Sequence, residues 1–329
     1  MRENDIRPRE LLNEYLRLSE QDATTLFADG ARDDVPCVAC ASAHTEHAFT
    51  KNGFGYSRCL DCGTLYQTPR PRLEVFERFY VNSVSSDFWA KVFFPQVAEA
   101  RRAAVFAPRA AELARMLKER GFSARTVVDV GAGHGVFLSE LVARLDGATG
   151  IAVEPSSEMI ESCRKLGFEV REALAEDVTD LDGRGDLVCS LEVMEHVHDP
   201  LRFISNLATF TAPGGWVFFT TLGADGFDIT VLGEHANAVF PPHHLNFMSV
   251  KGFEILCGRA GLTDVEVLTP GKLDVDIVRN KASEIPGLLD NQPFIRALLG
   301  NEQAAAAFQQ FLANNRMSSH SWVLARKPD

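Results

Sequence analysis

No apolar run in this 329-residue sequence approaches the roughly 20 residues that a helix needs to cross a lipid bilayer. The first ten residues, MRENDIRPRE, carry too many charges for a secretory signal. Positive charge is scarce as well, because 33 Lys and Arg residues face 45 Asp and Glu residues and leave a net charge of −12. Such a balance opposes partners that are bound mainly through their phosphates, bulk nucleic acid among them. We therefore expect a cytoplasmic protein that spans no membrane and binds no nucleic acid.

Cysteine is also sparse, and its distribution is more informative than its number. Of the seven cysteines, Cys163, Cys189 and Cys257 are scattered through apolar segments, where they can serve as small core residues. The other four form two Cys-x-x-Cys pairs, which are made of Cys37, Cys40, Cys59 and Cys62. In a reducing cytosol, paired cysteines of this kind favour a metal site over disulfides.

The two cysteine pairs, separated by residues 41–58, have the spacing of a zinc ribbon. In a ribbon, two tight turns each supply two thiolates to one tetrahedral ion. Four thiolates complete the coordination shell, so we expect a structural zinc rather than a catalytic one. The alternatives are two unrelated cysteine doublets, or a redox pair that leaves the other doublet unexplained. His44 and His47 lie between the pairs and are competing ligand candidates, although surface positions suit them better.

From about residue 124 onward, short apolar strands alternate with amphipathic helices. This alternation predicts right-handed βαβ units and a parallel sheet, hence an α/β fold. The strands are expected at residues 126–130, 150–153, 167–171, 186–190, 216–221, 264–268 and 321–326. Two long excursions, residues 222–248 and 270–318, interrupt the rhythm and are expected to form lids.

The pattern divides the chain into four parts. These are an N-terminal helical segment (residues 1–36), the zinc-ribbon module (37–75), an aromatic and helical connector (76–120), and the α/β domain with its two lids (121–329).

The first strand of the α/β domain runs into Asp129-Val130-Gly131-Ala132-Gly133-His134-Gly135, which opens the first helix. Glycine permits a sharp turn and close approach of a ligand, and the helix N-terminus adds unpaired N–H groups. The dinucleotide fingerprint would have glycine where Val136 stands, so the spacing here is Gly-x-Gly-x-Gly instead. Glu154, at the end of the second strand, can accept hydrogen bonds from both hydroxyls of a ribose. A generic tight turn is the alternative, but Asp129 and Glu154 together favour a ribose-containing ligand.

Three strings together resemble the class I methyltransferases: residues 129–135, Val153-Glu154-Pro155, and Leu191-Glu192-Val193-Met194-Glu195-His196-Val197-His198-Asp199-Pro200. The last string is especially similar to the ubiquinone-biosynthesis O-methyltransferases, and Pro213-Gly214-Gly215 is also typical of them. The resemblance covers about residues 124–270. It implies an S-adenosylmethionine-dependent methyltransferase with a seven-stranded Rossmann-like sheet and helices on both faces.

By position, the resemblance also implies a cofactor site. The glycine turn would hold the methionine part of S-adenosylmethionine and Glu154 the ribose. Ala175 and Glu176 would flank the adenine, although Leu174 stands where the family usually has an acidic residue. Leu191 and Glu192 would approach the amino-acid end or the methyl group. The whole predicted set is Asp129, Gly131, Ala132, Gly133, Gly135, Glu154, Pro155, Ala175, Glu176, Leu191 and Glu192.

The excursion after the fifth strand ends in Pro241-Pro242-His243-His244-Leu245-Asn246-Phe247. Open α/β sheets bind ligands at the carboxyl ends of their strands, and histidine titrates near neutral pH. In the resembling enzymes, a histidine at about the place of His244 faces the pocket. We therefore predict His244, and after it His243, as the base that takes a proton from the acceptor. The alternative is that these histidines only pack and hydrogen-bond within the lid.

The string from Gly53 to Pro71 is similar to the zinc-ribbon preface of some bacterial methyltransferases, several of which act in sugar and surface-polysaccharide pathways. We therefore expect a small hydroxylated acceptor, such as a sugar or a nucleotide-sugar. A zinc-containing RNA methyltransferase is the main alternative, which the net charge of −12 disfavours. A binding protein with a degenerate methyltransferase fold is disfavoured by the intact glycine turn with Asp129 and Glu154.

Overall fold

The computed structural model of the chain describes residues 2–28 and 30–329. The chain forms two compact units, each built from separate stretches of sequence. The first unit contains Met1–Trp89, Thr221–Phe253 and Val267–Trp322, and the second contains Ala90–Thr220, Glu254–Glu266 and Val323–Asp329. The domain boundaries at residues 36, 75 and 120 that the sequence suggests stay predictions. Within the described ranges, no helix combines the length and the apolar character that crossing a membrane requires.

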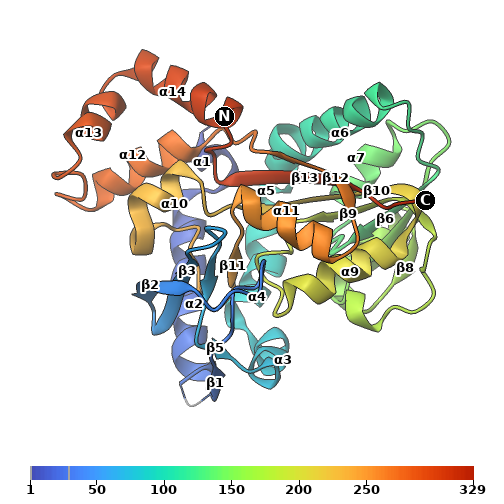
Figure 1. The fold of residues 1–329 in the computed structure, drawn as a ribbon, viewed down its shortest axis with the longest axis horizontal. Coiled ribbons are helices and arrows are strands. Elements are labelled where there is room, and N and C mark those ends of the chain that lie inside the picture. The colour runs from blue at the N-terminus through green and yellow to red at the C-terminus, as the bar shows by residue number, and fades with distance from the viewer. Residues whose placement is uncertain (1, 29) are drawn as a thin grey trace. The chain divides into compact units, whose positions relative to one another are not determined.

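The second unit is built around a seven-stranded sheet with the strand order β12-β13-β10-β9-β6-β7-β8 (Figure 1). Its strands are β6 (Thr126–Val130), β7 (Thr149–Val153), β8 (Glu169–Arg171), β9 (Gly185–Leu191), β10 (Thr211–Leu222), β12 (Thr263–Leu268) and β13 (His320–Arg326). The central strands β6 and β9 are buried over most of their length, which explains their nearly continuous apolar sequences. The α/β fold with a seven-stranded Rossmann-like sheet is confirmed.

Strand direction differs from the expectation at one edge of this sheet. Strands β6 to β10 pair in parallel, as crossover units require. Strand β13 runs antiparallel to β10, because Gly214 N–H donates to the Lys327 carbonyl near one end and Gly223 N–H donates to the Ser319 carbonyl near the other. The expectation of a wholly parallel sheet is therefore wrong at β13. The chain returns to the sheet there from the long excursion at residues 270–318 rather than from one crossover helix.

Helices cover both faces of this sheet, with α6 and α7 on one side and α9 on the other (Figure 1). The helices around the sheet are α5 (Phe94–Arg101), α6 (Ala107–Glu119), α7 (Val136–Val142), α8 (Ser157–Lys165), α9 (Pro200–Phe210) and α11 (Val250–Arg259). Among the described residues, three of them begin at side-chain caps. At the start of α11, Ser249 Oγ accepts a hydrogen bond from Gly252 N–H over 2.8 Å. Ser156 accepts a hydrogen bond from Met159 N–H at the start of α8, and Asp199 accepts one from Arg202 N–H at the start of α9.

The first unit contains a four-stranded sheet in the order β11-β4-β3-β2, a two-stranded ribbon and several helices. The strands are β1 (Arg32–Asp33), β2 (Thr45–Lys51), β3 (Phe54–Cys59), β4 (Leu65–Gln67), β5 (Arg70–Pro71) and β11 (Asn246–Phe247). The helices are α1 (Glu3–Ile6), α2 (Arg9–Leu26), α3 (Leu73–Asn82), α4 (Val84–Phe88), α10 (Phe227–Leu232), α12 (Asp274–Glu284), α13 (Pro293–Leu299) and α14 (Glu302–Asn314). One apolar core joins most of these elements and includes Phe27, Phe54, Phe76, Phe79 and Phe247.

The cysteine module and the excursion after β10 share the four-stranded sheet. Strand β4 of the module pairs antiparallel with β11 of the excursion. Buried Arg70 donates from Nη2 to Asn246 Oδ1 over 2.7 Å, and the Tyr56 hydroxyl donates to the His244 carbonyl over 2.7 Å. The cysteine module therefore stabilises the position of the segment that contains His243 and His244, through this strand pairing and these two hydrogen bonds.

A buried polar network holds His243. Its side chain is 7% exposed, and Nε2 lies 2.7 Å from Ser85 Oγ. Ser85 Oγ in turn donates to Asp22 Oδ2 over 2.5 Å, and the hydroxyl of Ser83 donates to the same carboxylate oxygen over 2.8 Å. The ring of Phe240 stacks on His243 with the two centroids 5.0 Å apart. A buried network with this many satisfied bonds rigidifies the segment that contains it.

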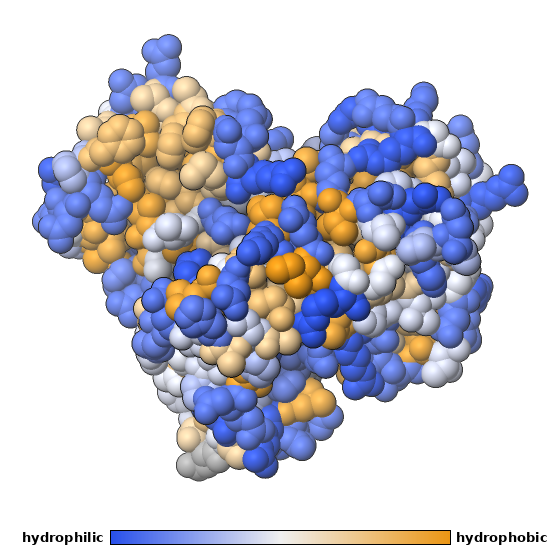
Figure 2. Space-filling model, viewed as in Figure 1, coloured by the Kyte–Doolittle hydropathy of each residue, from blue (hydrophilic) through white to orange (hydrophobic). Residues whose placement is uncertain are grey.

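Helices α13 and α14 of the first unit leave apolar surface uncovered (Figure 2). Phe294 is 73% exposed and Phe311 is 49% exposed, whereas Leu299 and Leu312 on the same helices are buried. Phe311 stacks on Phe308 with 6.0 Å between ring centroids. Each helix thus contributes to the core with one face and carries an aromatic residue on the other.

Candidate cofactor and metal sites

The glycine turn lies between β6 and α7, at the carboxyl end of a central parallel strand. Gly131, Gly133 and Gly135 have φ angles of 76°, 54° and 73°, in the left-handed region that favours glycine. A Cβ atom on Gly131 would lie 2.4 Å from Val193 Cγ2, so packing also excludes a side chain there. At Gly133 the nearest such atom is Met159 Sδ at 4.0 Å. This part of the turn therefore leaves space for a ligand beside its backbone.

Glu154 faces the glycine turn from the end of β7. Its side chain is 7% exposed, Oε2 accepts from Gly133 N–H over 2.9 Å, and Oε1 accepts from Ser156 N–H over 3.0 Å. Burial raises the pKa of Glu154, although the two N–H donors oppose that shift. Each carboxylate oxygen keeps a second lone pair for a further donor. The structure thus fixes a buried acceptor directly against the turn.

Asp129 lies near the end of β6, just before the glycine turn, and its carboxyl group has fewer hydrogen-bond partners than that of Glu154. It is 2% exposed, and within the described residues its Oδ1 has no hydrogen-bond partner. Burial, and then the charge of Glu154, raise the pKa of Asp129 to about 7. An unpartnered buried carboxyl oxygen is costly, and strongly shifted groups of this kind cluster at functional sites. A positively charged ligand beside the glycine turn would supply the missing partner.

The other predicted cofactor residues lie beyond the ends of neighbouring strands. Buried Ala175 and half-buried Glu176 belong to the short 3₁₀ turn Ala175–Asp177 that follows β8. Leu191 is the last residue of β9, and Glu192 follows it with a φ of 57°. These residues share the carboxyl edge of the sheet with the glycine turn, where open α/β sheets bind ligands. Two more predicted residues are half-buried Ala132 and exposed Pro155.

Arg109 also lies at this edge, although the sequence did not single it out. It comes from α6, is 4% exposed, and donates from Nη1 to Thr220 Oγ1 over 2.8 Å and to Glu192 Oε1 over 3.2 Å. Its sequence signal is an arginine on an apolar helix face, four and eight residues before buried Leu113 and Leu117. A charge at such a core-facing position requires a buried partner. The partners Glu192 and Thr220 are remote in sequence, so the helical pattern alone could not predict them.

The four paired cysteines converge in the first unit. Their sulfur atoms all lie within 4.8 Å of one another. The Cys37 and Cys62 sulfurs are 3.5 Å apart, as are those of Cys40 and Cys59. Zinc–sulfur bonds of about 2.3 Å in a tetrahedron place sulfurs about 3.8 Å apart. The donor set and its spacing therefore fit one zinc ion.

Both cysteine pairs form the same kind of turn. In each, the residue after the second cysteine donates its N–H to the carbonyl of the first cysteine, over 2.7 Å from Ala41 and 2.8 Å from Gly63. Both residues adopt left-handed backbone, with φ angles of 61° and 85°. His44 and His47 are exposed and are not part of the cysteine cluster. The two turns are thus equivalent halves of one four-thiol site.

The two histidines predicted as bases have different surroundings. Nδ1 of His244 lies 2.7 Å from the Ala238 carbonyl oxygen. A carbonyl only accepts, so Nδ1 carries the hydrogen and Nε2 of the neutral ring is the acceptor. His243 instead places Nε2 against Ser85 in the buried network. The geometry favours His244 over His243 as a base.

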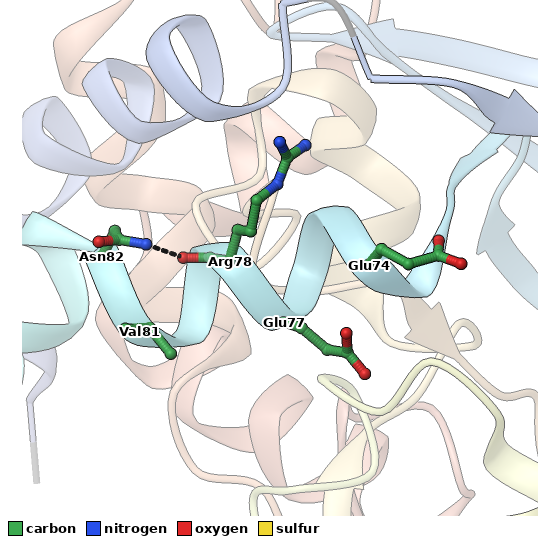
Figure 3. Close-up of a pocket in the computed structure, with 5 residues that line it drawn as sticks. All are labelled: Glu74, Glu77, Arg78, Val81 and Asn82. Atoms are coloured by element: carbon green, nitrogen blue, oxygen red, sulfur yellow. Dashed lines mark hydrogen bonds between the residues drawn. The ribbon is translucent and has the colours of Figure 1, made fainter.

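A surface hollow of 610 Å³ lies along α3 in the first unit (Figure 3). It is lined by Glu74, Glu77, Arg78, Val81 and Asn82. All belong to one helix, and Val81 is 83% exposed. The hollow contains none of the predicted site residues, so the carboxyl edge of the seven-stranded sheet remains the candidate cofactor site.

Comparison with known proteins identifies the family of the chain. The family model described as "Methyltransferase domain" matches residues 98–267. Ubiquinone biosynthesis O-methyltransferase from Nitrosomonas europaea is 36% identical over 110 residues, which cover 31% of this chain and 46% of that protein. The enzyme of the same name from Aromatoleum aromaticum is 27% identical over 163 residues, which cover 46% of this chain and 69% of that protein.

The solved structures include phosphoethanolamine N-methyltransferase 2 of Haemonchus contortus in complex with S-adenosyl-L-methionine. It is 15% identical, with a TM-score of 0.45 and coverage of 74% of this chain and 60% of that one. The chain spans about half the length of most of the curated relatives that it matches. The family match covers just over half of the chain and includes the glycine turn, Glu154 and the end of β9. The protein therefore belongs to the methyltransferase domain family, which confirms the prediction of an S-adenosylmethionine-dependent methyltransferase.

Proposed function

We propose that this methyltransferase acts on a hydroxyl group of a small metabolite, a sugar or nucleotide-sugar of a surface-polysaccharide or secondary-metabolite pathway. The observation that carries the cofactor part of this proposal is the buried Asp129 carboxyl, with one oxygen unpartnered, beside the glycine turn and Glu154. The relatives named O-methyltransferases support oxygen as the acceptor atom. The net charge of −12 disfavours the alternative of an RNA substrate.

The residues at the carboxyl edge fit S-adenosylmethionine, which supplies a methyl group activated on a positively charged sulfur. The glycine turn would hold the methionine part, and Glu154 would accept hydrogen bonds from the ribose hydroxyls. Asp129 would offset positive charge of the ligand. Ala175 and Glu176 would flank the adenine. These assignments account for the unpartnered oxygen of Asp129 and for the space at Gly133.

The four cysteines fit a structural zinc ion, since four thiolates leave no position for a substrate or water. The zinc would hold the two turns that flank the hairpin of β2 and β3. Because β4 of this module pairs with β11, the metal would also stabilise the excursion that carries His244.

His244 is proposed to remove the proton from the acceptor hydroxyl. Its Nδ1–H is engaged by Ala238, so Nε2 is the atom that would receive a proton. The backbone of His244 is held from Tyr56 of the cysteine module, which limits movement of the ring. A histidine that is already held in position, with Nε2 unprotonated, needs little rearrangement before it accepts the proton during methyl transfer.

Methyl incorporation from tritiated S-adenosylmethionine tests the proposed substrate class. The wild-type protein is offered sugars, nucleotide-sugars and RNA in separate reactions, with Glu154→Ala as the cofactor-site control. Incorporation into a hydroxylated small molecule, lost in the control, is the expected result. Incorporation into RNA alone would establish the alternative substrate, and cofactor binding without transfer to any acceptor would point to a non-catalytic binding protein.

The affinity for S-adenosylmethionine should rise between pH 6 and pH 8. The carboxyl of Asp129 has a pKa raised to about 7 by burial and by Glu154, and a cationic ligand favours its ionised form. Binding should therefore release a proton below pH 7 and become independent of pH above about 8. Calorimetry in buffers of different ionisation enthalpy measures that proton. Asp129→Asn should bind with a flat profile over the same range, and an unchanged pH dependence in this variant would remove Asp129 from the cofactor site.

A further inference from the structure

Arg109, Glu192 and Thr220 form a buried three-residue contact at the carboxyl ends of β9 and β10. The Glu192 oxygen Oε1 accepts from Arg109 Nη1 over 3.2 Å and from Thr220 Oγ1 over 2.7 Å. Arg109 Nη1 also donates to Thr220 Oγ1 over 2.8 Å. Arg109 is 4% exposed and Thr220 is fully buried, whereas the Glu192 side chain is 30% exposed. The contact therefore holds Glu192 Oε1 in place, while part of the Glu192 side chain remains exposed at the carboxyl edge of the sheet.

The backbone of Glu192 supports a functional reading of this contact. Its φ angle is 57°, in the left-handed region that non-glycine residues rarely adopt. Its N–H donates to the Thr220 carbonyl over 2.8 Å, so the strained residue is held from both its backbone and its side chain. Strained residues that neighbouring structure holds in place are concentrated at ligand-binding sites. Glu192 follows directly after β9, which lies next to the strand that leads into the glycine turn.

The charges in this contact are arranged around the arginine. Burial lowers the pKa of Arg109, and the carboxylates of Glu192 and Glu195 oppose that shift by stabilising the guanidinium. Glu195 is 2% exposed. The two carboxylates lie on the same loop after β9, and both interact electrostatically with the buried guanidinium of Arg109. Removing the cation would withdraw its attraction from both carboxylates, and the change of charge would favour a different orientation of the Glu192 side chain.

We propose that Arg109 is a positioning residue for methyl transfer, which with Thr220 fixes the Glu192 carboxylate to receive a positively charged group of the cofactor. The inference rests on the proposed cofactor site. Arg109 itself touches Glu192 and Thr220, and it acts on the ligand through Glu192. Its role is to hold the orientation of one carboxylate and to limit the negative charge of the loop. Lysine at this position would restore the charge but not the planar guanidinium, whose Nη1 donates to both Glu192 and Thr220.

A double-variant cycle with S-adenosylhomocysteine and S-adenosylmethionine as calorimetric ligands tests the proposal. Arg109→Met and Glu192→Gln should each weaken S-adenosylmethionine binding by about tenfold to a hundredfold, the range for losing a charge-assisted hydrogen bond. Adding Arg109→Met to Glu192→Gln should weaken binding no further, since Arg109 acts through Glu192. Arg109→Lys should recover part of the affinity. Arg115→Met is the matched control, because Arg115 lies on the same helix with an exposed side chain and should bind like wild type.

Thermal unfolding of each variant separates a folding defect from a binding defect. If Arg109→Met alone does not fold, the double variant removes both charges together and is compared directly with Glu192→Gln. Wild-type binding in Arg109→Met, or a further loss when it is added to Glu192→Gln, would overturn the positioning role. Failure of the wild-type protein to bind either ligand would instead overturn the proposed cofactor site.

Discussion

Replacing His244 with alanine should lower the turnover number by about 100- to 10,000-fold, the usual range for loss of a general base. Cofactor affinity should stay nearly unchanged. The hydrogen bond from Nδ1 to Ala238 makes Nε2 the proton-accepting atom, so the alanine variant lacks an acceptor for the substrate proton. Histidine side chains ordinarily titrate near neutral pH. The wild-type rate should therefore rise with pH through that range, and the rate of the variant should not.

Steady-state kinetics on folded variants checks this expectation with the acceptor identified by methyl incorporation. His235→Ala is the matched control, because His235 lies in the same excursion with an exposed side chain. A His244 that only packs within its segment would give a raised KM or a lower melting temperature with kcat preserved. That outcome would leave proximity and orientation of the acceptor as the main source of catalysis.

Replacing Cys62 with serine should abolish zinc binding and unfold the small sheet of the first unit. The second cysteine turn directly joins β3, which ends at Cys59, to β4, and β4 pairs with β11, so loss of the metal would disturb all three strands. Structural zinc contributes about 10–16 kcal/mol of apparent binding free energy in small modules, so loss of one thiolate is a large perturbation. Metal analysis should find one zinc per wild-type chain and none in the variant. Hydrogen exchange should rise across residues 45–67 and at β11.

Two controls accompany this experiment. Cys257→Ala removes a buried cysteine of α11 that lies outside the cluster, and it should keep its zinc. Binding of S-adenosylmethionine, measured by calorimetry, should persist in Cys62→Ser, because the glycine turn, Asp129 and Glu154 all belong to the second unit. Freshly purified, reduced wild-type protein that contains no zinc would refute the metal assignment.

The parts of the protein that the sequence predicts well are those encoded locally. The glycine turn needs left-handed backbone at three nearby positions, and only glycine adopts it without strain. The cysteine pairs likewise make two separate turns, each complete within a few residues. The strands and helices around the glycine turn follow from apolar periodicity over short windows. Residue types and spacing alone therefore suffice to place them.

The parts that the sequence does not predict depend on contacts between distant segments. Arg109 contacts Glu192 and Thr220, which lie 83 and 111 residues further along the chain, and the helical pattern of α6 shows only a charged residue on its apolar face. The direction of β13 depends on how the chain returns from residues 270–318. The buried pairing of His243 with Ser85 joins the excursion after β10 to helix α4, 158 residues away in the sequence. No local periodicity encodes pairings of this kind.

The cofactor site is tested most directly by calorimetric titration of S-adenosylmethionine into the wild-type protein and Glu154→Ala. Loss of the buried Glu154 acceptor should weaken binding by about 5- to 150-fold, which corresponds to about 1–3 kcal/mol. Glu161→Gln is the control, because Glu161 is exposed on α8 and should bind like wild type. One binding event per wild-type chain and the stated loss in Glu154→Ala are the expected results. Equal affinity in the two proteins, with Glu154→Ala folded, would contradict the proposed site and place the cofactor elsewhere.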